Sequence, residues 1–126
     1  MNWTLDKSRP ICPQIYELIC VAVANKELSV GEKLLSVREV ALEAGVNPNT
    51  VQKSFEELER RGVIHSVRCS GWYVNENIDA AVEEVKSLRR KKTEEYLAAM
   101  SLLGCSSNEI IKYLNDCKEV NNEQSS

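Results

Sequence analysis

The feature that most restricts how this chain can fold is a pair of short helices whose ends are marked in the sequence. Ser36 and Glu39 have the S-x-x-E spacing of a capping box, in which each side chain bonds the other residue's backbone amide. Gly45 stands where the first helix is expected to exit in a left-handed conformation. Asn47 and Pro48 then begin the second helix as its N-cap and first helical residue. Two capped helices joined by a tight glycine turn predict a helix-turn-helix.

The second of these helices has two chemically different faces along its length up to Gly62. Val51, Phe55 and Leu58 recur at i, i+4 and i+7, so we expect them to pack into the core. The opposite face is polar and carries Asn49, Gln52, Lys53, Glu56 and Arg60. This helix is therefore expected to present polar side chains outward from an apolar support.

The residues after Gly62 change from helical spacing to alternation. Residues 63–68 alternate in the manner of a strand. Residues 69–71, Cys-Ser-Gly, can form a turn, and the aromatic and β-branched residues 72–74 suit a second strand. A hairpin directly after a helix-turn-helix predicts a winged helix.

Helices are also predicted on both sides of this region. Apolar residues at helical spacing predict a helix from Pro10 to Asn25, and residues 3–5 are expected to add a short strand before it. Residues 78–103 contain no proline or glycine and predict one long helix. Its middle, residues 89–95, is polar on every side, so we expect it to bridge two packing surfaces.

The long helix is expected to stop at Gly104, after which Ser106 and Glu109 form a second capping box that opens a final helix. The chain is thus predicted to be mostly α-helical with a small β wing. The expected organisation is a winged helix-turn-helix domain over 1–76, a two-helix region over 77–120 and a disordered polar tail over 121–126.

Composition sets further limits. The 126 residues suffice for one small domain with an appended piece. The net charge is −3, but residues 1–75 are balanced and residues 76–126 carry the whole excess, so charge neither favours nor excludes nucleic acid. The chain has no apolar run of about 18 residues that could span a membrane. Its N-terminus lacks the pattern of a secretory signal, so we expect a cytoplasmic protein.

The cysteines and the single histidine limit which disulfides, metal sites and catalytic sites the chain can form. There are five cysteines, none at C-x-x-C spacing, and His65 is the only histidine. An odd number of cysteines argues against a disulfide framework, and the spacing argues against a zinc site. A single imidazole offers few ways to activate a nucleophile. We therefore expect no metal, no cofactor and no enzymatic activity.

Three stretches of the chain match a known family in both residues and spacing. They are residues 31–41 (GEKLLSVREVA), 45–53 (GVNPNTVQK) and 58–64 (LERRGVI). Residues 10–74 thereby resemble the DNA-binding domain of GntR-type bacterial transcription regulators. The short tail after them resembles that of the small YtrA-like branch. The family usually has proline before the capping box, where this chain has Leu35. The resemblance implies a regulator of transcription that binds double-stranded DNA and dimerises through its last two helices.

An α-helix fits the major groove, and the N-terminal part of the second helix of a helix-turn-helix reads the bases. Amide, hydroxyl and ammonium groups at that end of the helix can bond base edges or phosphates. The resemblance implies further contacts from Arg38 in the preceding helix and from Arg68 and Gly71 in the wing. The candidate DNA-binding residues are therefore Arg38, Asn47, Asn49, Thr50, Gln52, Lys53, Arg68 and Gly71.

Some of these residues also have a purely structural interpretation. Arg38 could pair with Glu39 or Glu43 on a solvated helix face. Asn49 and Thr50 could serve only the cap of their own helix.

One winged helix makes few base contacts, so we expect a two-fold homodimer that reads a pseudopalindrome with half-sites about 34 Å apart. The apolar residues expected to form its interface are Tyr96, Leu97, Met100, Leu103, Ile110, Ile111 and Leu114. These features predict a sequence-specific transcription regulator acting as a repressor, with a winged-helix protein–protein interaction module as the alternative. The short tail leaves little room for an effector cavity, and any small-molecule effector stays unassigned.

Overall fold

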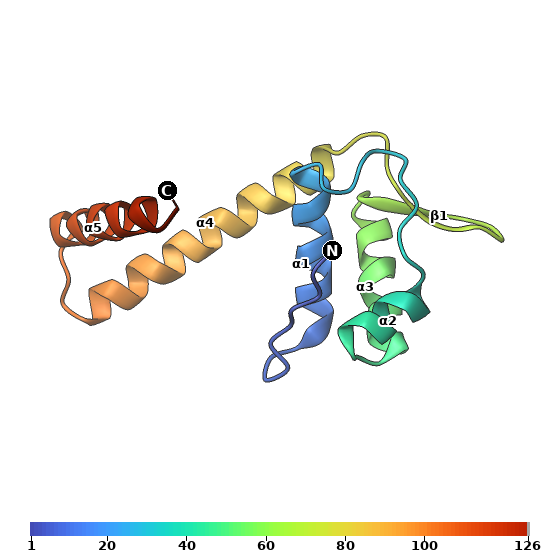
Figure 1. Ribbon diagram of the computed structural model, residues 1–126, viewed down its shortest axis with the longest axis horizontal. Coiled ribbons are helices and arrows are strands. Elements are labelled where there is room, and N and C mark those ends of the chain that lie inside the picture. Colours follow the sequence, from blue (N-terminus) through green and yellow to red (C-terminus); the bar gives the residue numbers. More distant parts are fainter. Residues whose placement is uncertain (126) are drawn as a thin grey trace. The chain divides into compact units, whose positions relative to one another are not determined.

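The computed structural model describes the backbone of residues 1–125 and the side chains of residues 1–118. This part of the chain forms five helices and one two-stranded antiparallel sheet (Figure 1). Residues 1–87 make one compact unit, and a second unit begins at Leu88. The predicted mostly helical fold with a small β wing is confirmed.

The N-terminal unit is built on three helices and a hairpin. Its elements are α1 (Ile11–Ala24), α2 (Val37–Ala44), α3 (Pro48–Arg60), β1 (Ile64–Val67) and β2 (Gly71–Val74). Both α1 and α2 pack against α3, and β1 contacts α3 as well (Figure 1). The central helix α3 is therefore held on several sides while its N-terminus stays at the surface.

The helix caps have the predicted geometry. The Ser36 hydroxyl accepts a hydrogen bond from the Glu39 amide at 3.1 Å, and the Glu39 carboxylate accepts one from the Ser36 amide at 3.1 Å. Gly45 ends α2 with φ +68°, a left-handed conformation that glycine adopts without steric cost. The Asn47 side chain caps α3 by accepting from the Asn49 amide at 2.8 Å. These capping hydrogen bonds and the left-handed glycine set the ends of the two helices of the helix-turn-helix.

The core lies between α1 and α3. Val51, Phe55 and Leu58 of α3 are all fully buried, as predicted from their spacing. They belong to one apolar cluster with Ile15 and Ile19 of α1. Burial of these side chains is the main force that holds α3 in place.

The wing contains a third extended segment. In the hairpin, Ile64 of β1 pairs with Val74 of β2. On the other side of β2, Lys33 pairs with Tyr73 and the Leu34 amide donates to the Trp72 carbonyl oxygen at 2.8 Å. The sheet therefore gains backbone hydrogen bonds from the segment that leads into α2.

The strand expected at residues 3–5 is wrong, because this segment has no regular structure. The free side of β2 is occupied by the segment around Lys33, so residues 3–5 have no strand to pair with there. Trp3 is instead anchored through its side chain, whose indole nitrogen donates to Glu43 Oε2 at 3.0 Å.

The fourth helix, α4 (Asp79–Leu102), takes part in both units. Ala81 and Val85 in its first turns are buried in the core of the N-terminal unit, which is why this unit extends to Ser87 and not only to residue 76. Residues 89–99 are exposed throughout, consistent with the polar middle expected for this helix.

In the C-terminal unit, Gly104 turns the chain with φ +75° before α5 (Ser107–Ser125). The second predicted capping box is present, since the Ser106 amide donates to Glu109 Oε1 at 3.2 Å and the Glu109 amide donates to the Ser106 hydroxyl at 3.3 Å. The tail predicted as disordered, 121–126, overlaps the end of α5, whose helical backbone continues to Ser125. The side chains of these residues lie outside the described part.

The described residues also bear on membrane insertion, disulfide bonds and metal binding. None of the helices in the described part of the chain is long and apolar enough to cross a membrane. All five cysteines are free. Among the described residues, no three His, Cys, Asp or Glu side chains form a group that could hold a metal ion.

Candidate nucleic-acid interface

A groove of about 380 Å³ lies between α2, α3 and the wing. Its lining residues are Lys33, Leu34, Ser36, Val37, Arg38, Glu39, Gln52, Ser70, Gly71 and Trp72. The groove brings together three of the predicted DNA-binding residues, Arg38, Gln52 and Gly71, from three different elements. They converge because α2 and the hairpin both pack on α3.

The other predicted residues lie outside this groove. Asn47, Asn49 and Lys53 are exposed at the first turns of α3, and Arg68 is exposed at the wing turn. Thr50 is half-buried beside them. The first turns of α3 thus form a polar tip at the surface, where the positive end of the helix dipole favours an anionic partner such as phosphate.

Arg38 is exposed and forms no ion pair within 4 Å among the described residues. The two carboxylates that could have paired with it have other partners. Glu39 is held in the capping box, where the hydrogen bond from the Ser36 amide keeps the pKa of its carboxyl below the ordinary value. Glu43 accepts from the indole of Trp3. The guanidinium of Arg38 is therefore available to a ligand.

Gln52 is half-buried and its amide nitrogen donates to Glu56 Oε1 at 3.1 Å, one turn further along α3. This bond occupies one donor of the amide and leaves its carbonyl oxygen free. Bonding adenine with both its groups requires the carbonyl oxygen and one N–H of the Gln52 amide, so the second N–H can keep the contact with Glu56. The bond with Glu56 therefore restricts the orientations in which this amide can meet a base edge.

Gly71 begins β2 with φ +142°, in the region that favours glycine. A Cβ atom at this position would lie 3.1 Å from Cε of Lys33. The absence of a side chain therefore lets the Lys33 stem run across the start of the wing. Lys33 lines the groove together with Arg38 and was missed by the sequence analysis. The only signal for it was a positive charge just before the first helix cap.

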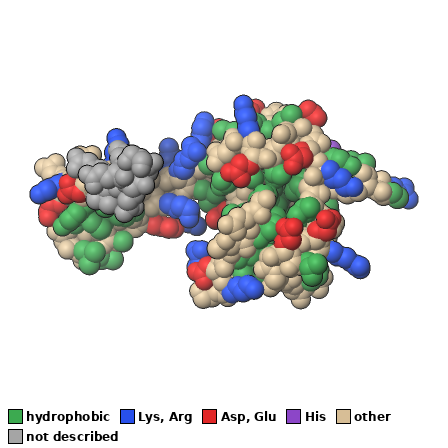
Figure 2. Space-filling model, viewed as in Figure 1, with side chains coloured by type: hydrophobic (Ala, Val, Ile, Leu, Met, Phe, Trp, Pro, Cys, Tyr) green, Lys and Arg blue, Asp and Glu red, His purple; other side chains and the backbone are tan. Residues whose placement is uncertain are grey.

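The acidic residues in the second half of α3 are held by neighbours in the chain. Glu57 pairs with Arg60 at 2.5 Å and with Arg61 at 3.1 Å, and the hydrogen bond from Arg60 is the main reason that the pKa of Glu57 is lowered. Glu59 Oε2 accepts from the amide of Ser66 at 2.8 Å. Figure 2 shows acidic and basic side chains interspersed over the visible face, without one large basic patch.

The residues predicted to form the dimer interface lie in the C-terminal unit. In the single chain, five of them are exposed: Tyr96, Leu97, Leu103, Ile111 and Leu114. Met100 is half-buried, and Ile110 is buried within the unit with only 7% of its surface exposed. Leu102 and Tyr113 are also exposed and were not singled out from the sequence.

The comparisons with known proteins agree with this geometry. Residues 13–74 match the model of the bacterial regulatory proteins, gntR family. The HTH-type transcriptional regulator YhcF of Bacillus subtilis is 35% identical over 112 residues, which cover 89% of this chain and 93% of YhcF. The HTH-type transcriptional repressor YtrA of the same organism is 40% identical over 79 residues, covering 63% of this chain and 61% of YtrA.

Among solved structures, a GntR family transcriptional regulator from Listeria monocytogenes has a TM-score of 0.77 and 34% sequence identity, covering 89% of this chain and 98% of that protein. The predicted family is thus confirmed along nearly the whole chain. The family and these relatives are transcription regulators and not enzymes. From its capped helix-turn-helix, its wing and these similarities, the chain belongs to the GntR family of bacterial regulatory proteins, as a DNA-binding transcriptional regulator.

Proposed function

We propose that this regulator binds a pseudopalindromic operator as a homodimer and represses transcription. The observation that carries the proposal is the groove in which Arg38, Gln52 and Gly71 meet, next to the exposed first turns of α3. Arg38 supplies a basic side chain, Gln52 supplies an amide that can bond a base edge with two atoms, and Gly71 belongs to the wing. Winged helices hold DNA by contacts of these kinds.

The acidic residues of α3 determine how this helix can approach DNA. Glu56 and Glu59 lie beyond the first turns of the helix and would be repelled by phosphates. Entry by the N-terminus, with the C-terminal half tilted out of the major groove, keeps these carboxylates away from the duplex. This orientation assigns base reading to Asn49, Thr50 and Gln52. Asn47, Lys53 and Arg68 are then placed for phosphates or the edge of the groove.

The homodimer is supported by apolar surface in the C-terminal unit. Leu103 is 80% exposed in the single chain, and Leu114 and Ile111 are more than half exposed. A groove of about 260 Å³ in the same unit is lined by Met100, Leu103, Gly104, Cys105, Glu109 and Tyr113. Contiguous apolar surface of this kind is typical of an interface that a second copy covers. Buried Ile110 supports the interface from inside the unit.

Repression is supported by the similarity to YtrA, which is named as a transcriptional repressor. A dimer seated on an operator excludes other proteins from the same stretch of DNA.

The DNA-binding test begins with duplexes selected from a random library by the full-length protein. Fluorescence anisotropy then compares the wild type with Arg38→Ala and Gln52→Ala. A base reader loses about 1–3 kcal/mol of discrimination at its own position, whereas loss of a phosphate contact weakens all sequences alike. Arg60→Ala is the matched control, because Arg60 lies at the far end of α3 and pairs with Glu57.

If neither Arg38→Ala nor Gln52→Ala changes binding, the assigned surface is wrong. The affinity should also fall steeply as salt is added, because DNA binding releases counterions. If the selection enriches no duplex and binding does not depend on salt, a protein–protein interaction module is the better interpretation.

The dimer is tested by analytical ultracentrifugation at tens of micromolar protein. We expect a dimer for the wild type and a shift towards monomer for Leu97→Glu and Leu114→Glu. Leu42→Glu is the control, because Leu42 is equally apolar and 86% exposed but lies on α2. A monomeric wild type would rule out the homodimer.

A further inference from the structure

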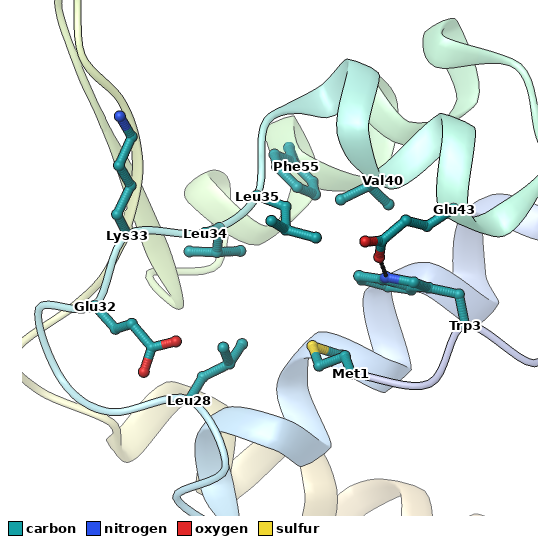
Figure 3. Close-up of a pocket in the computed structure, with 10 residues that line it drawn as sticks. All are labelled: Met1, Trp3, Leu28, Glu32, Lys33, Leu34, Leu35, Val40, Glu43 and Phe55. Carbon is teal, nitrogen blue, oxygen red and sulfur yellow. Dashed lines mark hydrogen bonds between the residues drawn. The ribbon is translucent and has the colours of Figure 1, made fainter.

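A second cavity of the N-terminal unit has a volume of about 280 Å³ and shares only Lys33 and Leu34 with the lining of the DNA-facing groove. Figure 3 shows it enclosed by the N-terminal segment, by α2 and by the segment that leads into α2. Its volume is near the lower end of the roughly 300–1,000 Å³ typical of small-molecule sites. The cavity is therefore large enough for a small compound.

The walls of this cavity are apolar and aromatic. Val40 and Phe55, both almost fully buried, belong to its inner wall together with Leu34. Leu28 and the half-buried indole of Trp3 close it on the outer side. Such walls fit the hydrocarbon or aromatic body of a ligand, and the half-exposed face of Trp3 also attracts a cation.

Two carboxylates give the cavity a negative charge. Glu32 and Glu43 both point towards its interior in Figure 3. Among the described residues, neither has a cationic side chain within 4 Å. Glu43 accepts only from the Trp3 indole, and Glu32 accepts from the Ser29 amide at 3.1 Å.

Lys33 does not neutralise these carboxylates. Its stem crosses the start of the wing at Gly71, and its ammonium group points away from the cavity in Figure 3. The cavity therefore combines apolar walls with two negative charges that lack a counterion. Both glutamates are exposed to water, so a cationic ligand gains an attraction that a neutral ligand of the same shape lacks, and an anionic ligand is repelled.

We propose that this cavity binds a small organic cation with an apolar body, namely a primary amine on an aromatic or aliphatic group. The ammonium group donates to Glu43 or Glu32, and the apolar body lies against Trp3, Leu28 and Leu35. The site goes beyond DNA binding and does not depend on it. Because α2 and residues 33–34 line both this cavity and the DNA-facing groove, an occupant contacts the same elements that present Arg38.

The site can be tested without DNA, so its failure and a failure of the proposed operator binding are separate results. The full-length protein carries any purification tag at its C-terminus, because Met1 lines the cavity. Phenethylamine is titrated into 15N-labelled protein, and 2-phenylethanol serves as a neutral ligand of the same shape. The readout is the indole N–H signal of Trp3, with that of Trp72 as an internal reference.

We expect saturable movement of the Trp3 signal by phenethylamine, with a dissociation constant on the order of 1 mM or tighter. Binding of 2-phenylethanol should be at least about tenfold weaker, which corresponds to about 1.4 kcal/mol. Glu43→Gln keeps an acceptor for the indole but removes the charge, so it should weaken amine binding severalfold, as should Glu32→Gln. Glu83→Gln, on exposed α4, is the control for loss of one negative charge.

Three results would overturn the proposal. The first is the absence of saturable movement of the Trp3 signal. The second is equal affinity for the amine and the alcohol, which would show a merely apolar cavity. The third is amine binding that is unchanged in both Glu32→Gln and Glu43→Gln, which would place the amine elsewhere.

Discussion

The hydroxyl of Ser54 in α3 donates a hydrogen bond to the carbonyl oxygen of Cys12 in the first turn of α1, with the two oxygens 2.8 Å apart. Ser54 is completely buried, and its hydroxyl also lies 3.2 Å from the Thr50 carbonyl oxygen and from Cys12 Sγ. This contact ties α3, the helix proposed to read DNA, to α1.

We expect Ser54→Ala to lower the free energy of unfolding by about 1 kcal/mol, because one buried hydrogen bond is lost. A loss of this size corresponds to roughly 4–8 °C in melting temperature for a unit of this size. Thermal and urea unfolding measure both quantities. Ser29→Ala, at an exposed loop position, should change neither. Equal stability of the two variants would show that the contact with Cys12 contributes nothing.

Gly71→Ala should destabilise the wing by about 1–3 kcal/mol, because alanine is strained at φ +142°. The added Cβ would also crowd the Lys33 stem, 3.1 Å away. Hydrogen exchange of the Tyr73 and Val74 amides reports on the wing directly. The double variant Lys33→Ala/Gly71→Ala removes the crowding but not the strain. Full recovery of protection in the double variant would show that backbone strain is unimportant.

The capping box makes stability depend on pH through Glu39. Its pKa is lowered in the folded chain because its carboxylate accepts from the Ser36 amide. Because the folded pKa of Glu39 is lower than its unfolded value of about 4.3, the carboxylate stabilises the fold at pH values above about 4.3. This contribution is lost as the pH falls through the folded pKa. We therefore expect the melting temperature to fall less steeply in acid for Glu39→Gln than for the wild type.

Glutamine is a suitable replacement because it retains an acceptor for the Ser36 amide but does not titrate. Measurement of the Glu39 side-chain carbon shift against pH gives the pKa itself. A value at or above about 4.3, or parallel acid profiles for the two proteins, would contradict this role for the carboxylate.

Glu56→Ala should strengthen DNA binding. The substitution frees the Gln52 amide from its 3.1 Å bond and removes a negative charge near the phosphates. We expect a gain of about 0.5–1.5 kcal/mol, the size of one net hydrogen bond, measured by fluorescence anisotropy on a selected duplex. Glu83→Ala removes a similar charge from α4 and should have little effect. Weaker binding by Glu56→Ala would mean that Glu56 positions Gln52 for DNA instead of withholding it.

The helix-turn-helix could be predicted from local residue patterns. The bonds of Ser36 with Glu39 and of Asn47 with Asn49 join residues two or three positions apart, so spacing alone was enough to predict them. Burial of Phe55 followed from helical periodicity for the same reason. The family resemblance added Arg38, whose role no local pattern could have indicated.

The contacts between distant segments became visible only once the chain was folded. The pairing of Lys33 with Tyr73 and the bond of Trp3 to Glu43 each join segments 40 residues apart in sequence. Such contacts form because α2 and the hairpin both pack on the apolar face of α3. No periodicity along the chain encodes them. The groove and the second cavity are therefore products of packing, whereas the helices that border them begin and end where neighbouring residues dictate.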